Sequence, residues 1–316
     1  TPRETMETVL KAIGYEDFRR RQAEDRAHSV YRGLGLCVVV EPTTYGSAFY
    51  KSAGIPGSGH ESAWVRIEPS GAVNASVGLM GTGQGYETAL SQAVAEGLGI
   101  DPVKVTMHLG NTDIAPYGMG SRGARGGTAG GSTLYLAARD AQTKVLAIAA
   151  NMLSLNTPGE LRLVDGRVER QTGGKWDDVD LTLAEVARQA YLDPTNLPKG
   201  MEPGLEFHKS FDPPPMTYSN ASHVCEVTVD PETGRTMIEH YIIAEDCGTV
   251  LNPIVAEGQQ HGATALGISG TLYEEVYYDE SGQNLTGLLA DYLVPTACEI
   301  PNFEPIPMQK APELNH

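Results

Sequence analysis

The sequence is poor in cysteine, and none of its cysteines lie close together. The chain of 316 residues has four, and they form no CxxC pair: Cys37, Cys225, Cys247 and Cys298. This argues against a zinc ribbon, and against an iron–sulfur cluster held by this chain alone. Four scattered cysteines in a chain of this length indicate buried free thiols in a reducing compartment, so we expect a cytoplasmic protein.

Basic residues are also scarce. The chain has 23 Lys and Arg against 40 Asp and Glu, and its formal net charge is -17. A surface this acidic repels phosphate backbones and acidic membrane faces, so we expect no nucleic acid as a partner. A phosphorylated small ligand is still compatible with this charge, because main-chain N–H groups can bind anions without any lysine.

Long apolar runs and the signatures of common hydrolases are missing as well. No run approaches the roughly 20 apolar residues of a membrane helix, so we expect no membrane span. The first residues do not resemble a signal peptide, and both ends look as if they were cut from a longer chain. There is no GxSxG or HExxH motif, and no histidine pair at metal-ligand spacing predicts a metal site.

The hydrophobic pattern predicts helices and strands in mixed order. We expect helices at about 5–26 (two, separated at Gly14), 84–99, 128–153, 181–191 and 253–270. We expect strands at about 33–41, 62–68, 72–80, 103–109, 223–229, 236–244 and 272–278, with a hairpin in 160–180 and a loop at 42–59. The β-branched run at 33–41 is typical of a buried strand. The fold class is therefore α+β, with mixed sheets and packed helices.

A proline-rich, irregular stretch gives the best internal boundary. It covers residues 194–220, so we expect a first part at 1–193, this connection, and a second part at 221–316 that is incomplete at its C-terminal end.

Glycine is abundant, with 36 residues, and it gathers in two loops that precede helices. The first is Gly81-Thr82-Gly83-Gln84-Gly85, and the second spans residues 118–127. Each could present N–H groups to an anionic ligand, and Arg122 and Arg125 add positive charge to the second. A tight turn without a ligand, and arginines that are merely solvated, explain each loop equally well when it is taken alone.

A third segment of interest follows the turn Asp246-Cys247-Gly248. It places Gln259, Gln260 and His261 on the predicted helix at 253–270. A glutamine in mid-helix usually faces solvent, so this segment by itself assigns no function.

Taken in order, these three segments resemble one family. The first runs from Gly81 to Thr88, the second from Gly110 through Pro116 to Gly123, and the third from Asp246 to Gly248 with Asn252-Pro253 and Glu257-Gly258-Gln259. The set resembles the molybdopterin-binding large subunit of the xanthine dehydrogenase, aldehyde oxidase and aerobic carbon monoxide dehydrogenase family, and specifically its second molybdenum-binding domain. The likeness extends over nearly the whole chain.

The resemblance implies roles for particular residues. The family's Gly-Gln-Gly loop, which contacts the pterin and the ligands of the metal, corresponds to Thr82, Gly83, Gln84 and Gly85. Main-chain contacts from the second loop fall on Gly123, Ala124, Arg125 and Gly126, although Ala124 and Gly126 stand where many members have serines. A further glutamine that hydrogen-bonds the cofactor corresponds to Gln259, and Tyr45 and Phe49 lie where the family places part of its substrate pocket. Ordinary packing is the alternative for these two rings.

The resemblance also implies parts that this sequence does not contain. The family's catalytic glutamate, in a Gly-x-Gly-Glu stretch, is expected beyond His316, and the first molybdenum domain is expected before Thr1. The chain itself then carries no catalytic residue and no direct metal ligand. The implied cofactor is molybdopterin with molybdenum, in its cytosine dinucleotide form. The implied partners are the missing parts of the molybdenum subunit, an iron–sulfur subunit with 2Fe–2S clusters and a subunit with FAD.

The function implied is oxidative hydroxylation, in a hetero-oligomer, of a small substrate such as an aldehyde or an N-heterocycle, or the oxidation of carbon monoxide. The added oxygen would come from water, and electrons would leave through the iron–sulfur and flavin partners. Two alternatives remain at this point: a non-catalytic carrier or assembly subunit for the cofactor, which the missing glutamate favours, and a degenerate homologue with empty loops.

Overall fold

The computed structural model describes residues 1–308, and these form two compact units. One unit comprises residues 1–41 and 218–308, and the other comprises residues 42–217. The predicted division into 1–193, 194–220 and 221–316 places the boundaries differently from the observed ones, which lie after residues 41 and 217. The reason is that the N-terminal helices and most of the first strand belong with the C-terminal strands, because β1 pairs with β9. Within residues 1–308, no helix is both long enough and apolar enough to cross a membrane.

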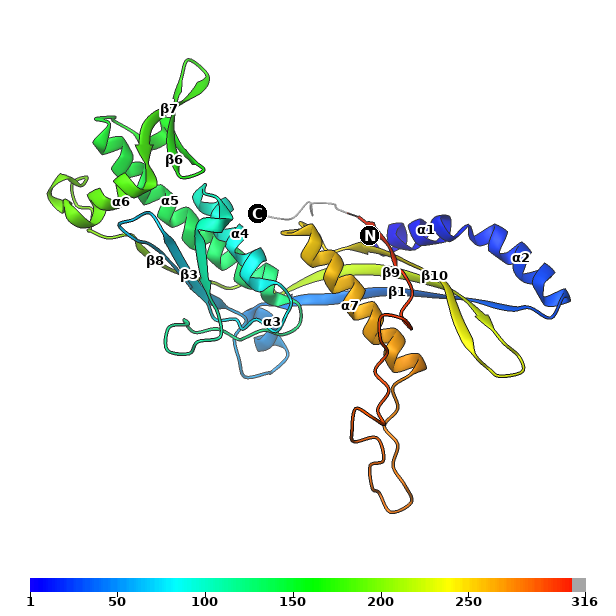
Figure 1. Ribbon diagram of the computed structural model, residues 1–316. Helices are drawn as coiled ribbons and strands as arrows, with labels where there is room; N and C mark the ends of the chain where they lie inside the picture. The colour runs from blue at the N-terminus through cyan, green and yellow to red at the C-terminus, as the bar shows by residue number, and fades with distance from the viewer. Residues whose placement is uncertain (309–316) are drawn as a thin grey trace. The chain divides into compact units, whose positions relative to one another are not determined.

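The unit of residues 42–217 contains a mixed sheet with two helices packed against it (Figure 1). Its strand order is β4-β3-β2-β8, and β3 pairs parallel to β4 but antiparallel to β2. The bounds are β2 Glu61–Ile67, β3 Val73–Val77, β4 Val105–His108, β8 Glu206–Phe211, α4 Tyr86–Leu98 and α5 Ser132–Met152. A turn of π-helix, Gly126–Gly131, leads into α5.

Alternating side chains build the core of this unit. Every second residue of β2 is buried, so that Ala63, Val65 and Ile67 face the helices. Helices α4 and α5 can approach closely because Gly97 has no side chain. A Cβ added there would lie 2.9 Å from the Cβ of Ala138. The predicted strands and helices of this region are therefore confirmed, to within a few residues at their ends.

A three-stranded antiparallel sheet and a short helix complete this unit. The sheet consists of β5 Leu161–Val164, β6 Arg167–Thr172 and β7 Lys175–Thr182, and α6 spans Leu183–Leu192. Thr182 caps α6 in a capping box with Glu185, which explains why the helix begins at this point.

Two predictions for this unit were wrong. The expected loop at 42–59 contains a short helix, α3 (Ser47–Ser52). The expected irregular stretch at 194–220 contains β8 and the start of β9 (Met216–Val229), because the prolines at 213–215 fall between these strands rather than within them. Strand β8 forms because it pairs with β2, about 145 residues earlier in the sequence.

The other unit contains a sheet of order β1-β9-β10-β11, with β1 at its edge (Figure 1). The bounds are α1 Pro2–Ile13, α2 Tyr15–Ala27, β1 Tyr31–Tyr45, β10 Thr236–Asp246, α7 Pro253–Leu272 and β11 Glu304–Pro307. Helix α1 ends at Gly14, whose φ of 65° suits glycine. Helix α2 is tied to the sheet by Arg21, which donates to the buried carboxylate of Glu226 at 3.3 Å.

This unit has the smaller core, and two predictions about its strands were wrong. Its main cluster consists of Val9, Val224, Ile242 and Ala244. Residues 35–41 of β1 are exposed rather than buried, because β1 is an edge strand and α1 packs against β10. No strand forms at 272–278, where α7 continues to Leu272 and only an isolated bridge at Tyr278 follows.

The prediction of buried thiols was also wrong. All four cysteines are free, but Cys37, Cys247 and Cys298 are exposed. Cys225 is half-buried on β9, and burial raises the pKa of its thiol to about 11.

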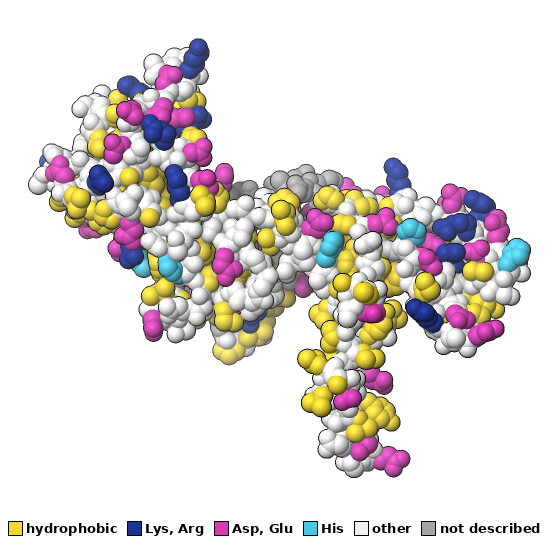
Figure 2. All heavy atoms as spheres, viewed as in Figure 1, with side chains coloured by type: hydrophobic (Ala, Val, Ile, Leu, Met, Phe, Trp, Pro, Cys, Tyr) yellow, Lys and Arg dark blue, Asp and Glu magenta, His cyan; other side chains and the backbone are white. Residues whose placement is uncertain are grey.

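Hydrophobic side chains are exposed along residues 273–303 of the same unit (Figure 2). The largest exposures are those of Leu288 (69%) and Leu289 (84%). Isolated apolar side chains are common on protein surfaces, but several in one segment indicate a surface that another protein part covers.

Candidate functional site

The first glycine loop, residues 81–85, lies directly before α4. Gly83 and Gly85 have φ angles of 98° and 71°, a conformation that favours glycine. The carbonyl oxygen of the Gln84 side chain turns back onto its own loop, where it accepts from the main-chain N–H of Thr82 and, at 3.1 Å, from the Thr82 hydroxyl. No hydrogen bond within residues 1–308 engages the main-chain N–H groups of Gly83, Gln84 and Gly85. The loop therefore presents free donors at the N-terminus of a helix.

The second glycine loop, residues 118–127, lies before the π-turn of α5. Gly123 and Ala124 are exposed and have successive positive φ angles of 51° and 56°. Successive main-chain N–H groups in such a conformation can form a concave site for anions. Gly126 is buried, and the Arg125 N–H donates to the carbonyl of Arg122 at 3.2 Å.

The two loops lie side by side. The ring of Tyr86, the first residue of α4, packs so closely on Gly126 that a Cβ there would collide with it. The hydroxyl of Ser121 donates to the carbonyl of Met80 at 2.6 Å, and the Met80 N–H donates back to that hydroxyl at 3.1 Å. The predicted residues 82–85 and 123–126 therefore belong to one region of the unit.

An aromatic pocket adjoins the second glycine loop. It has a volume of about 250 Å³ and is lined by Tyr45, Phe49, Tyr50, Arg122, Gly123 and Arg125. The centroids of the Tyr45 and Phe49 rings lie 4.7 Å apart, and a Cβ added at Gly123 would lie 3.8 Å from the Tyr45 ring. Helix α3 brings Phe49 and Tyr50 to this place. Tyr45 and Phe49 thus share a pocket with a loop that lies more than 70 residues away in the sequence.

The two arginines of the second loop have different environments. Arg122 is exposed, its guanidinium lies 5.2 Å from the centre of the Tyr50 ring, and it donates to the Tyr50 hydroxyl. Arg125 is buried, with its side chain 5% exposed, and it forms an ion pair with the fully buried Glu61. The expectation that both arginines offer positive charge is therefore wrong for Arg125, whose charge is neutralised by Glu61.

Gln259 belongs to the other unit, on α7, where it is exposed. Its neighbour Gln260 hydrogen-bonds the carboxyl of Glu245 on β10. Burial raises the pKa of this carboxyl, and the hydrogen bond from Gln260 lowers it by a smaller amount. His261 packs edge-on against Phe303, with 5.3 Å between the ring centroids.

Sequence reasoning missed Glu61, Tyr50 and Ser121. Glu61 had a weak signal, since a charged residue at the start of an alternating strand occupies an inward position of the pattern. Ser121 and Tyr50 had none, because their partners, Met80 and Arg122, lie 41 and 72 residues away in sequence.

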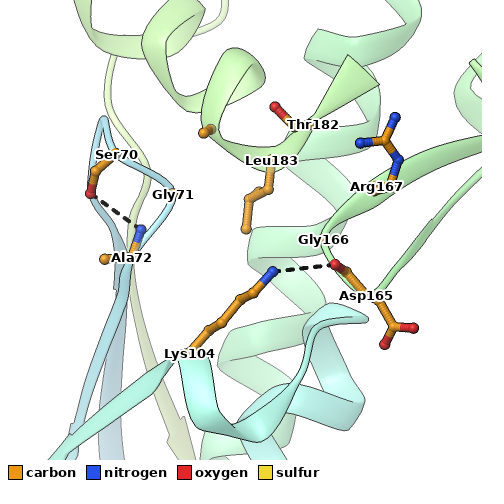
Figure 3. Close-up of a pocket in the computed structure, with 10 residues that line it drawn as sticks. Ser70, Gly71, Ala72, Lys104, Asp165, Gly166, Arg167, Thr182 and Leu183 are labelled. Atoms are coloured by element: carbon orange, nitrogen blue, oxygen red, sulfur yellow. Dashed lines mark hydrogen bonds between the residues drawn. The ribbon is translucent and has the colours of Figure 1, made fainter. Parts of the chain in front are cut away.

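A pocket of about 450 Å³ also occurs in this unit, between the β2–β3 turn, the β5–β6 turn and the start of α6 (Figure 3). Lys104 reaches across it and donates to the carbonyl of Asp165 at 3.4 Å. Arg167 on its wall forms ion pairs with Asp178 and Asp180. None of the predicted site residues lines this pocket, and we assign it no ligand.

Comparison with known proteins gives a consistent result. The family model described as "Molybdopterin cofactor-binding domain" matches residues 8–301. The chain is 36% identical over 303 residues to the carbon monoxide dehydrogenase large chain of Hydrogenophaga pseudoflava, and the match covers 95% of this chain and 37% of that protein. It is 34% identical over 301 residues to the nicotine 6-hydroxylase large subunit of Paenarthrobacter nicotinovorans, covering 95% of this chain and 36% of that subunit.

Solved structures agree. Quinoline 2-oxidoreductase from Pseudomonas putida 86 superimposes with a TM-score of 0.86 at 33% identity, covering 98% of this chain and 39% of that one. A Cu,Mo-containing carbon monoxide dehydrogenase superimposes with a TM-score of 0.85 at 32% identity, covering 97% of this chain and 38% of that one. The chain thus spans well under half the length of these relatives. The match over residues 8–301 shows that this chain belongs to the molybdopterin cofactor-binding domain family of the molybdenum hydroxylases.

Proposed function

We propose that this chain is the cofactor-binding part of a molybdenum hydroxylase. The complete enzyme would hydroxylate an aldehyde, an N-heterocycle or a similar small substrate, or oxidise carbon monoxide. One observation carries the proposal. The glycine loops at 81–85 and 118–127 lie side by side, with free main-chain N–H groups in the first loop and the exposed Arg122 in the second.

The residues present fit a pyrophosphate-bearing pterin. Free N–H groups at Gly83 to Gly85 and successive positive φ angles at Gly123 and Ala124 suit anionic oxygens. Within residues 1–308, Arg122 forms no ion pair with a carboxylate, so its charge is available to a phosphate. The overall charge of -17 repels anions from most of the surface, so a phosphate would depend on this local set of donors.

When bound, the cofactor supplies the redox chemistry, and the protein contributes binding and orientation. Thr82 holds the side-chain carbonyl of Gln84, which leaves the Nε2 hydrogens of Gln84 as donors toward the ligand. Gly123, Ala124, Arg125 and Gly126 contribute main-chain groups. For Gln259, the family resemblance implies a hydrogen bond to the cofactor.

The shape and lining of the aromatic pocket favour a flat substrate. Tyr45 and Phe49 offer ring faces next to the second glycine loop, and stacking on such faces favours planar rings. Its volume of about 250 Å³ suits a molecule of one or two rings. The names of two relatives, a nicotine 6-hydroxylase and a quinoline 2-oxidoreductase, are consistent with such a substrate.

The finer assignments belong to the same proposal. We propose the cytosine dinucleotide form of the pterin, 2Fe–2S and FAD partner subunits in a cytoplasmic hetero-oligomer, and a catalytic glutamate that this chain does not supply. The relatives' names, "large chain", "large subunit" and "subunit gamma", support an assembly of several subunits.

The test is metal and pterin analysis of the natively purified complex that contains this chain. Molybdenum and oxidised-pterin fluorescence near one per chain, with an iron–sulfur partner identified by mass, are expected. Replacing Gln84 with Ala should reduce pterin retention by about tenfold, as is typical when a group that orients a cofactor is lost. Neither molybdenum nor pterin in an intact complex would contradict the proposal. Pterin in a complex without turnover or an iron–sulfur partner would instead favour the carrier function.

A further inference from the structure

A buried ion pair lies beneath the second glycine loop. The side chain of Glu61, at the start of β2, is 0% exposed, and that of Arg125 is 5% exposed. Arg125 donates through Nη1 to Glu61 Oε2, while Oε1 of Glu61 accepts from the N–H of Ser62 at 3.3 Å. Gly78 and Gly118 surround this carboxylate so closely that a Cβ on either would collide with it. The packing is thus fitted to a carboxylate at this position.

Arg125 also connects two parts of the site. Its Nη1 donates to the carbonyl of Gly120 at 3.1 Å, within the second glycine loop. Its Nη2 donates to the carbonyl of Gly59 at 2.9 Å. Gly59 in turn packs directly on the backbone of Tyr45 and Gly46, so that a Cβ there would collide with it. One guanidinium therefore links the loop to the aromatic pocket's wall at Tyr45.

Stability alone does not explain such a pair. Two buried charges lose their hydration, and their mutual attraction roughly offsets this loss. Apolar residues of similar volume often replace a buried pair without loss of stability. What apolar residues cannot reproduce is the planar fork of donors that fixes carboxylate and carbonyl oxygens in one geometry.

We propose that Glu61 and Arg125 are a positioning pair that holds the second glycine loop and the Tyr45 wall of the aromatic pocket in one fixed arrangement for the cofactor. The inference rests on the proposed function and extends it to two buried side chains that act through the loop and the pocket wall. Glu61 orients Arg125, and Arg125 sets the loop through Gly120 and the wall through Gly59.

Three variants distinguish a role of this pair in positioning the loop and the pocket wall from a role in balancing two buried charges. Glu61→Gln leaves Arg125 buried without a counter-charge. Arg125→Lys keeps the charge but cannot reach Glu61 and both carbonyls at once. The double variant Glu61→Leu, Arg125→Met removes both charges and so avoids an unpaired one. Glu169→Gln, which breaks the exposed pair with Arg162, is the matched control.

The experiment measures pterin release from the purified complex, together with hydrogen exchange of residues 118–126. All three site variants should release pterin about tenfold faster than the unmodified protein, with faster exchange in the loop, while Glu169→Gln should change neither. Normal release from both Arg125→Lys and the double variant would overturn the inference, because charge balance would then be sufficient. If the unmodified complex holds no pterin, the proposed function fails, and loop exchange still decides the positioning role: equal exchange in all variants would overturn it.

Discussion

The two glycine loops use glycine for different purposes. In the first loop, residues 81–85, Gly83 has a φ of 98° and nothing within 4 Å of where its Cβ would be. In the second loop, Gly118 packs against the carboxylate of Glu61 and the backbone of Gly78. Gly83 thus provides conformational freedom in a loop whose N–H groups stay open, whereas Gly118 provides space for a buried side chain. A glycine count in a sequence does not distinguish these two requirements.

The largest effect in the loops themselves is expected for Gly118→Ala. The added methyl group would displace the buried carboxylate of Glu61, and overpacking of this kind costs about 1–3 kcal/mol of unfolding free energy. Urea denaturation gives the value. Gly159→Ala is the control, because Gly159 lies in the same unit, has no positive φ, and its added methyl group would meet only the Thr157 hydroxyl at 3.5 Å.

A double-mutant cycle would test whether the cost arises from Glu61. Glu61→Asp shortens the side chain, so the cost of Gly118→Ala should be smaller in that background. Strictly additive costs would mean that the backbone of Gly78, and not the carboxylate, limits the space.

A smaller cost is expected for Gly83→Ala. The methyl group meets no neighbour, so the loss comes from the positive φ alone and is about 1–2 kcal/mol. This cost should be the same in the unmodified protein and in the Glu61→Asp variant, which urea denaturation of the combined variant checks. Coupling between Gly83 and Glu61 would contradict this, because it would show that the two loops are packed as one unit.

Elements of the fold could be predicted from the sequence where contacts between neighbouring residues determine them, and were missed where distant residues do. The break between α1 and α2 at Gly14, the hairpin within 160–180 and the strand β2 are local features, and they were predicted because neighbouring residues determine them. The ordered set of three segments identified the family. Strand β8 was missed because only its pairing with β2 makes it a strand.

The candidate site divides in the same way. The glycine loops were visible as local patterns, and the resemblance pointed to Tyr45 and Phe49. The role of the Arg125 side chain could not be predicted, because its partner Glu61 lies 64 residues away and neither residue indicates the other. Likewise, the exposure of β1 follows from its place at a sheet edge, which a run of β-branched residues does not indicate.

The smallest expected effect lies outside both loops, at Glu245 on β10. Burial raises the pKa of this carboxyl above its ordinary value of 4.5, and the hydrogen bond from Gln260 only partly opposes this. A group whose pKa is raised by folding stabilises the protein below its ordinary pKa, and this contribution is lost as the pH rises through the folded value. The unit of residues 1–41 and 218–308 should therefore lose stability as the pH rises above 4.5.

Glu245→Gln stays uncharged at every pH, so it should remove this pH dependence and raise the thermal midpoint of that unit at pH 8. Thermal unfolding between pH 4 and 8 checks this, with Glu280→Gln, at an exposed position of the same unit, as the control. Hydrogen exchange in residues 81–85 and 118–127 should stay unchanged in Glu245→Gln. If exchange slowed in both loops together, their rates would reflect unfolding of the whole chain rather than local packing. The difference between the first loop, with its free N–H groups, and the second, held by Arg125, would then be measured by the rate of cofactor release.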